Sequence, residues 1–130
     1  MVSQRETRPW GAYQVVDEGA DFLVKRITVT PGQRLSYQRH QHRNEHWVIV
    51  SGSGFATIEG DDHRLEPGRV MEVPMGTAHR VTNDGSTDLT FVEVQTGSYF
   101  GEDDIERLED DYGRCADQAA SQAEASTPAD

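Results

Sequence analysis

The sequence predicts an all-β protein folded as a single barrel or sandwich. Short runs of alternating polar and apolar residues, rich in β-branched and aromatic side chains, recur along the chain. Gly, Pro, Asn and Asp separate these runs, and no helical periodicity occurs before residue 102. Many short strands joined by such turns are typical of a β-barrel or β-sandwich, and 130 residues fit one domain with one core.

Eight of these runs are predicted as strands. They cover residues 12–16, 22–29, 34–38, 46–50, 55–59, 69–73, 79–83 and 89–95. Turn-forming stretches such as TPGQ, SGSG, EGDD and NDGST separate them. The succession of runs and turns contains no internal repeat, so we expect neither a propeller nor a solenoid.

One stretch near the C-terminus departs from this pattern. Residues 102–113, EDDIERLEDDYG, place Ile105 and Leu108 on one helical face and carry acids in the first turn. We therefore expect a short helix or an irregular segment docked outside the barrel. From Cys115 onward the chain is small and polar, without bulky apolar side chains, which favours disorder. The predicted organisation is one domain over 1–114 and a disordered acidic and polar tail over 115–130.

The charge distribution limits the classes of partner. The net charge is −11, and residues 101–130 carry ten acids and two arginines, which leaves the rest of the chain nearly balanced. No basic stripe is present, so nucleic acid is not an expected partner, although a few arginines suffice for one phosphate. No apolar run is long enough to span a membrane. A single cysteine and the lack of an apolar leader predict a cytoplasmic protein.

A motif with a distinctive spacing lies in the stretch GRVMEVPMGTAHRVTN. Its members are Gly68, Pro74, Gly76, His79 and Asn83. Taken alone, the motif is also compatible with an ordinary hairpin that carries a surface histidine. The complete spacing resembles the second motif of the cupin superfamily, which implies a double-stranded β-helix, or jelly-roll, barrel.

The stretch RHQHRNEHW (39–47) holds three histidines and a glutamate. The first cupin motif is usually a glycine, five residues, a His-x-His pair, three or four residues, and a glutamate. That spacing fails if the visible HQH supplies the pair. It fits from Gly32 onward if Gln38 and His40 supply the pair and Glu45 supplies the carboxylate.

The cupin resemblance therefore implies a site with oxygen and nitrogen donors. Its ligands would be Gln38, His40, Glu45 and His79. Such a set suits one divalent metal ion, Zn, Mn, Fe, Co or Ni, and the donor types do not select among them. Strand alternation points His42 into the barrel with His40, either on the metal or in contact with substrate. His46 falls on the opposite face and is predicted to point outward.

Longer stretches narrow the resemblance to one family. RPWGAYQVV (8–16), residues 22–54, VPMGTAHRVTN (73–83) and EVQTGSYFGEDDIERLEDDYGR (93–114) are similar to type II mannose-6-phosphate isomerase. In many members this module is the C-terminal part of a bifunctional enzyme that is also a mannose-1-phosphate guanylyltransferase. The resemblance implies metal-dependent interconversion of mannose 6-phosphate and fructose 6-phosphate. The chain has no glycine-rich nucleotide loop, so nucleotide transfer is not expected of it.

The implied chemistry suggests roles for residues near the motifs. An aldose–ketose isomerase needs a base near the substrate's C2 proton and cations that hold the phosphate. His42 is the first candidate for the base, and Glu72 is the second. The candidate phosphate ligands are Arg43, Arg80 and Lys25, each of which is alternatively a surface charge in a salt bridge.

Two other functions fit the same motifs. One is a metal-containing module that binds a sugar phosphate without catalysis, and the other is an Fe(II)-dependent cupin dioxygenase, which the glutamine ligand and the sugar-phosphate resemblance disfavour. The barrel also predicts a homodimer, because open sheet edges are often covered by a second subunit. The N-terminal stretch 8–16 is the candidate contributor to that interface.

Overall fold

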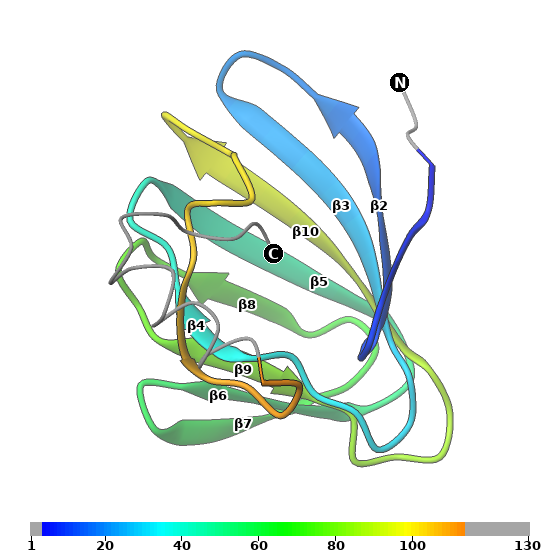
Figure 1. Cartoon of the computed structure of the whole chain (residues 1–130). Coiled ribbons are helices and arrows are strands. Elements are labelled where there is room, and N and C mark those ends of the chain that lie inside the picture. Colours follow the sequence, from blue (N-terminus) through cyan, green and yellow to red (C-terminus); the bar gives the residue numbers. More distant parts are fainter. Residues whose placement is uncertain (1–3, 114–130) are drawn as a thin grey trace.

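The chain folds into two antiparallel sheets that face each other, as the computed structural model shows (Figure 1). The structure describes residues 4–113. Its elements are β1 (Glu6–Arg8), β2 (Gly11–Glu18), β3 (Phe22–Val29), β4 (Tyr37–Arg39), β5 (Arg43–Ser51), β6 (Gly54–Ile58), β7 (Asp61–Leu65), β8 (Val70–Val73), β9 (His79–Thr82), β10 (Leu89–Gly97) and β11 (Glu106–Glu109). The all-β prediction is confirmed.

Strands that are distant in sequence are neighbours in both sheets. The six-stranded sheet has the order β1-β2-β3-β10-β5-β8, and the five-stranded sheet has the order β11-β4-β9-β6-β7. β10 therefore lies between β3 and β5, and β9 lies between β4 and β6. This interleaving brings the two sequence motifs, carried by β4–β5 and β8–β9, to one end of the barrel.

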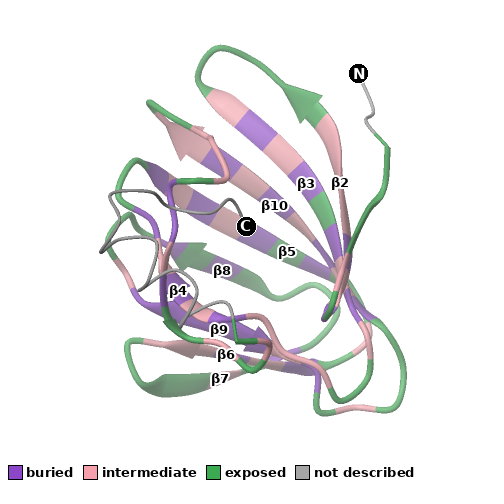
Figure 2. Cartoon of the chain, in the orientation of Figure 1, coloured by how far each residue is buried: buried purple, intermediate pink, exposed green. Residues whose placement is uncertain are grey.

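The core follows from strand alternation. Along β5, Trp47 and Ile49 are buried, whereas Val48 and Val50 are exposed, and Figure 2 shows such alternation along the larger sheet. Trp47 packs against Phe91 of β10 with ring centroids 5.3 Å apart. Apolar side chains fill the barrel beyond this pair, so the polar side chains at the other end are held against a rigid base.

The helix expected within residues 102–113 does not form. Glu106–Glu109 is instead strand β11, which pairs with β4. Ile105 is buried while Leu108 is 38% exposed, so these two residues do not share a buried face. The segment is therefore an edge strand of the smaller sheet and is not docked outside the barrel, and its acids form ion pairs with other strands. The predicted tail, 115–130, lies outside the described residues.

Strands β1, β7 and β11 were not predicted from the sequence. Each is short or highly charged, which hides the alternation that a strand prediction needs. Within residues 4–113 all regular elements are strands, and no helix there could cross a membrane.

Candidate metal centre

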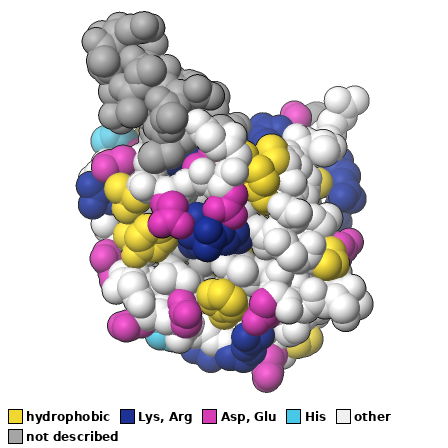
Figure 3. Space-filling view, turned by 60° about the horizontal axis from the view of Figure 1, so that its bottom comes forward, with side chains coloured by type: hydrophobic (Ala, Val, Ile, Leu, Met, Phe, Trp, Pro, Cys, Tyr) yellow, Lys and Arg dark blue, Asp and Glu magenta, His cyan; other side chains and the backbone are white. Residues whose placement is uncertain are grey.

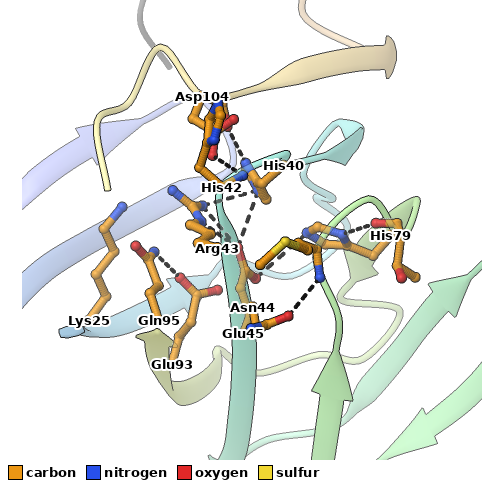
Figure 4. A network of polar contacts seen from close by, with 12 residues as sticks. Lys25, His40, His42, Arg43, Asn44, Glu45, His79, Glu93, Gln95 and Asp104 are labelled. Atoms are coloured by element: carbon orange, nitrogen blue, oxygen red, sulfur yellow. Dashed lines mark hydrogen bonds and ion pairs between the residues drawn. The ribbon is translucent and has the colours of Figure 1, made fainter. Parts of the chain in front are cut away.

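Three side chains of ligand type meet at the polar end of the barrel. His40 directly follows β4, Glu45 lies in β5 and His79 opens β9, and all three are buried with ligand atoms within 4.8 Å of one another. Glu45 Oε2 lies 3.2 Å from His40 Nε2, and Glu45 Oε1 lies 3.6 Å from His79 Nε2 (Figure 4). The carboxylate therefore stands between the two imidazoles.

Both imidazoles are oriented by backbone carbonyls. His79 Nδ1 donates to the carbonyl oxygen of Thr77 at 2.9 Å, and His40 Nδ1 donates to that of Asp104 at 2.5 Å. A proton on Nδ1 leaves the Nε2 lone pair of each ring facing the carboxylate. This is how metal-binding histidines are usually held, with the outer nitrogen donating to a fixed acceptor.

Gln38 completes the predicted ligand set. It is the direct cross-strand partner of His79, so both side chains project from the same face of the sheet. Its Oε1 is buried and makes no hydrogen bond, which is costly for a carbonyl oxygen. A divalent ion, or water bound to it, would satisfy this oxygen. The cavity at this point is about 30 Å³, enough for an ion or one water molecule, so the residues fit the metal.

Arg43 contacts two of the candidate ligands. Its Nε donates to Glu45 Oε2 at 3.0 Å, and its Nη2 lies 2.9 Å from the same oxygen in an ion pair. Nη2 also donates to His40 Nε2 at 3.1 Å. Burial would raise the pKa of Glu45, but the charges of Arg43 and the two histidines hold it well below the usual range. Burial lowers the pKa of His40 to about 4 against the opposing effect of Glu45. At neutral pH both groups are therefore in the states that ligate metals.

Lys25 and Glu93 line the same cavity from β3 and β10. Lys25 Nζ lies 2.7 Å from Glu102 and 4.4 Å from the ring centre of Tyr13. Burial, followed by the charge of Glu45, raises the pKa of Glu93 to about 8. The sequence analysis missed Glu93, although one signal was visible. It occupies an inward position of β10 after the buried Leu89 and Phe91, and an acid is rarely buried unless it is paired.

The prediction that His42 points into the barrel is wrong. β4 ends at Arg39, a turn follows, and β5 begins at Arg43, so alternation does not continue across the gap. His40 and Arg43 are both buried, whereas His42 is exposed and contacts Tyr99 edge to face. His42 does not line the cavity that the candidate ligands share. His46 is half-exposed, as predicted, and lies 3.8 Å from Glu72.

Two other predicted site residues also lie away from the cavity. Glu72 faces outward on β8 with a side chain that is 76% exposed, so it does not approach the candidate ligands. Arg80 follows His79 and projects to the opposite side of β9, where it donates to Glu109 and to the carbonyl of Leu35. Figure 3 shows basic side chains lying next to acidic ones on the molecular surface. Of the three predicted phosphate ligands, only Lys25 and Arg43 line the cavity.

The barrel and its buried His–Glu–His group define a double-stranded β-helix protein with a candidate metal centre. The chain belongs to the family described as Mannose-6-phosphate isomerase C-terminal, whose profile matches residues 1–110. The cupin resemblance and the narrower family resemblance are thereby confirmed. The structure is also similar to that of a Klebsiella pneumoniae protein with a double-stranded β-helix domain, with a TM-score of 0.65, 26% identity, and coverage of 73% of this chain and 81% of that chain.

Two relatives illustrate the setting of this family. The chain is 52% identical over 112 residues to the alginate biosynthesis protein AlgA of Pseudomonas aeruginosa, covering 86% of this chain and 23% of AlgA. It is 48% identical over 107 residues to the mannose-1-phosphate guanylyltransferase ManC of Salmonella typhimurium, covering 82% of this chain and 22% of ManC. The chain thus spans less than a quarter of the length of these relatives.

Proposed function

We propose that the chain interconverts mannose 6-phosphate and fructose 6-phosphate with the help of a divalent metal ion. The observation that carries this proposal is the buried His40–Glu45–His79 group beside the unsatisfied Gln38 carbonyl. It occurs in a chain whose family is named for this isomerase. Gln38, His40, Glu45 and His79 would hold the ion, which when bound would stabilise negative charge on the substrate oxygens.

The cavity supplies side chains for the other requirements of the reaction. Lys25 has its ammonium group at the cavity wall, where it can bind a phosphate. Glu93 is the carboxyl group that lines the cavity outside the candidate ligand group. We propose Glu93 as the group that moves the proton between C1 and C2, in place of His42 and Glu72. Gln95 Nε2 donates to Glu93 Oε2 at 2.6 Å and fixes its orientation.

Substrate binding on this proposal requires a change at the cavity mouth. The cavity has room for an ion or one water molecule but is too small for a hexose phosphate. Lys25 is bound by Glu102, whose side chain is 28% exposed. An incoming phosphate would replace this carboxylate on Lys25 and thereby open the contact between β3 and the segment that begins at Glu102.

An assay of metal-loaded protein with mannose 6-phosphate, run beside unphosphorylated mannose, tests the activity. We expect turnover of the phosphorylated sugar only. Replacing Lys25 with Met should mainly raise KM, because it weakens the hold on the phosphate in ground and transition state alike. The matched control is Arg26→Met, which alters the next residue of β3 on its exposed face. Sugar-phosphate binding without turnover in metal-replete protein would contradict catalysis and favour the binding module.

A further inference from the structure

The turn between β4 and β5 is fastened to a segment more than sixty residues away. Asp104 is buried, and its two carboxylate oxygens accept the backbone N–H groups of Gln41 and His42, each at 3.0 Å. The carbonyl oxygen of the same residue accepts from His40 Nδ1. One residue therefore contacts both the ring of a candidate ligand and the turn that joins this ligand to Glu45 (Figure 4).

We propose that Asp104 is a positioning residue of the metal centre. Its carbonyl selects the His40 tautomer with a proton on Nδ1, and its carboxylate sets the distance between that carbonyl and the β4–β5 turn. The carboxylate is not expected to touch the metal, because both its oxygens are used by backbone donors. The inference rests on the metal site of the proposed function but not on the isomerase activity.

The surroundings of Asp104 support a positioning role. Ile105 is buried next to it, and β11 pairs with β4 from Glu106 onward, so the segment cannot shift without breaking strand contacts. Glu106 also forms an ion pair with Arg39, but that pair is about two-fifths exposed and touches no candidate ligand. Glu106 therefore offers a control in the same segment.

Metal affinity separates this role from a purely structural one. We would titrate Co²⁺ into metal-free wild-type protein, Asp104→Ala, Asp104→Asn and Glu106→Gln, following the absorption of the bound ion. Asp104→Ala keeps the carbonyl that accepts from His40 but removes the carboxylate that fixes this carbonyl against the β4–β5 turn. Disturbing the outer contact of a ligating histidine typically weakens metal binding by about 10–100-fold, and we expect a loss within that range. Asp104→Asn, which keeps one acceptor oxygen, should lie between it and wild type. Glu106→Gln should bind Co²⁺ like wild type.

The His40 tautomer provides a readout that does not depend on metal or activity. In metal-free wild type, long-range nitrogen–proton NMR should show the proton on Nδ1, and Asp104→Asn should populate the other tautomer. A wild-type ring protonated on Nε2 would overturn the proposal without any variant. Unchanged Co²⁺ affinity in a folded Asp104 variant would overturn it as well. If Asp104→Ala does not fold, Asp104→Asn decides the affinity question, and the isomerase assay remains independent of both.

A different observation concerns the outer face of the larger sheet. Six valines from four adjacent strands lie there, and we call this surface the valine face: Val24, Val48, Val50, Val70, Val92 and Val94. Val48 is the direct partner of both Val70 and Val92, so the side chains are contiguous. Val48, Val50 and Val70 are 43–58% exposed. A contiguous apolar surface of this kind usually marks an interaction site.

We infer that the valine face binds a second copy of this chain, and charge complementarity is the reason. Arg26 lies at the β3 border of the face and Glu72 at the β8 border, three strands or about 14 Å apart. A two-fold axis lying in the face along β5 and β10 would place β3 of each copy over the partner's β8. Arg26 would then lie two residues, or about 7 Å, along the strand from the partner's Glu72, a distance that its long side chain can span. The valines would then meet at the centre, as an isologous interface requires.

Sedimentation of the chain at about 100 µM, where micromolar dimers are populated, tests this arrangement. We expect a dimer that Val48→Lys dissociates, whereas the control Leu108→Lys, at an exposed residue of β11, does not. Arg26→Glu should weaken the dimer, and Arg26→Glu combined with Glu72→Arg should restore it. A monomeric wild type, or a dimer that Val48→Lys leaves intact, would overturn the inference. A dimer whose affinity is unchanged by Arg26→Glu, alone or combined with Glu72→Arg, would overturn the two-fold arrangement.

Discussion

His79 and His40 present the same imidazole nitrogen to the candidate metal centre, but the chain holds the two rings in different ways. The acceptor for His79 Nδ1 is the carbonyl of Thr77, two residues earlier in the same turn. The acceptor for His40 Nδ1 is the carbonyl of Asp104, 64 residues away. One half of the site is therefore built by a local motif, and the other half is built only when a distant segment docks.

This difference bears on how the site assembles. The turn Pro74–Thr77 is closed by its own hydrogen bond, from Thr77 N–H to the Pro74 carbonyl, and can orient His79 as soon as β9 pairs. The turn after His40 is held from outside by Asp104, by the N–H of Ser98, which donates to the carbonyl of His42, and by the N–H of Gly76, which donates to the carbonyl of His40. Contacts of such large sequence separation form late, because loop closure must come first.

The largest effect is expected from removing either ring. His40→Ala and His79→Ala should each abolish tight metal binding and isomerisation, because the loss of one imidazole leaves only one nitrogen donor beside a carboxylate and an amide oxygen. Metal content after dialysis is the measurement. The two variants should differ in thermal stability, since His40→Ala also removes the contact with Asp104. Full metal occupancy in either variant would contradict the ligand set.

A smaller effect is expected at Gln38. Its Oε1 has no hydrogen-bond partner, so Gln38→Leu should stabilise the metal-free protein, because replacing an unsatisfied buried carbonyl by an apolar group is favourable. The same change should weaken metal binding by about tenfold or more, as the loss of a supporting group does. The melting temperature of the metal-free protein should thus rise, while the metal affinity measured by titration should fall. Gln41→Leu, at an exposed position nearby, is the control.

The candidate ligands on both sides of the site could be predicted from the sequence, but the distant residue that orients His40 could not. The second motif fixed His79, and the spacing from Gly32 identified Gln38, His40 and Glu45, which the structure brings together. His42 was misplaced because the alternation of inward and outward side chains was extended through residues 40–42. These residues form a turn for which the sequence contains no recognisable signal. Asp104 and Glu93 could not be assigned from spacing at all, since their roles depend on pairing of β11 with β4 and of β10 with β5.

The fold shows the same division between local and distant information. Alternating apolar residues predicted the long strands, because each strand's own sequence shows which of its faces is buried. The acids of the segment at 102–113 are compatible with a helix N-terminus as well as with an extended strand. Their partners, among them Lys25, Arg39 and Arg80, come from three different strands. Only the folded barrel brings these cations beside the segment, and the resulting ion pairs favour an extended conformation over a helix.

A pH effect on stability is expected from Glu93. Its pKa is raised from 4.5 to about 8 in the folded chain, so the stability it contributes is present below about pH 4.5 and is lost as the pH rises through 8. Glu93→Gln does not titrate. In chelator-treated protein, the melting temperature of the variant relative to wild type should therefore rise from pH 5 to pH 8. A difference that stays constant would show that Glu93 is not buried as an acid.

The smallest effects are expected outside the barrel, at His42 and Glu72. Loss of a general base typically lowers turnover by about 10²–10⁴-fold, whereas His42→Ala and Glu72→Gln should each change it by less than about tenfold. The reason is position, because both side chains are exposed and neither lines the metal cavity. Glu93→Gln, assayed beside them with metal bound, should show the large loss. If His42→Ala instead lost turnover with metal retained, the β4–β5 turn would have to rearrange when substrate binds, and the remote half of the site would be the mobile half.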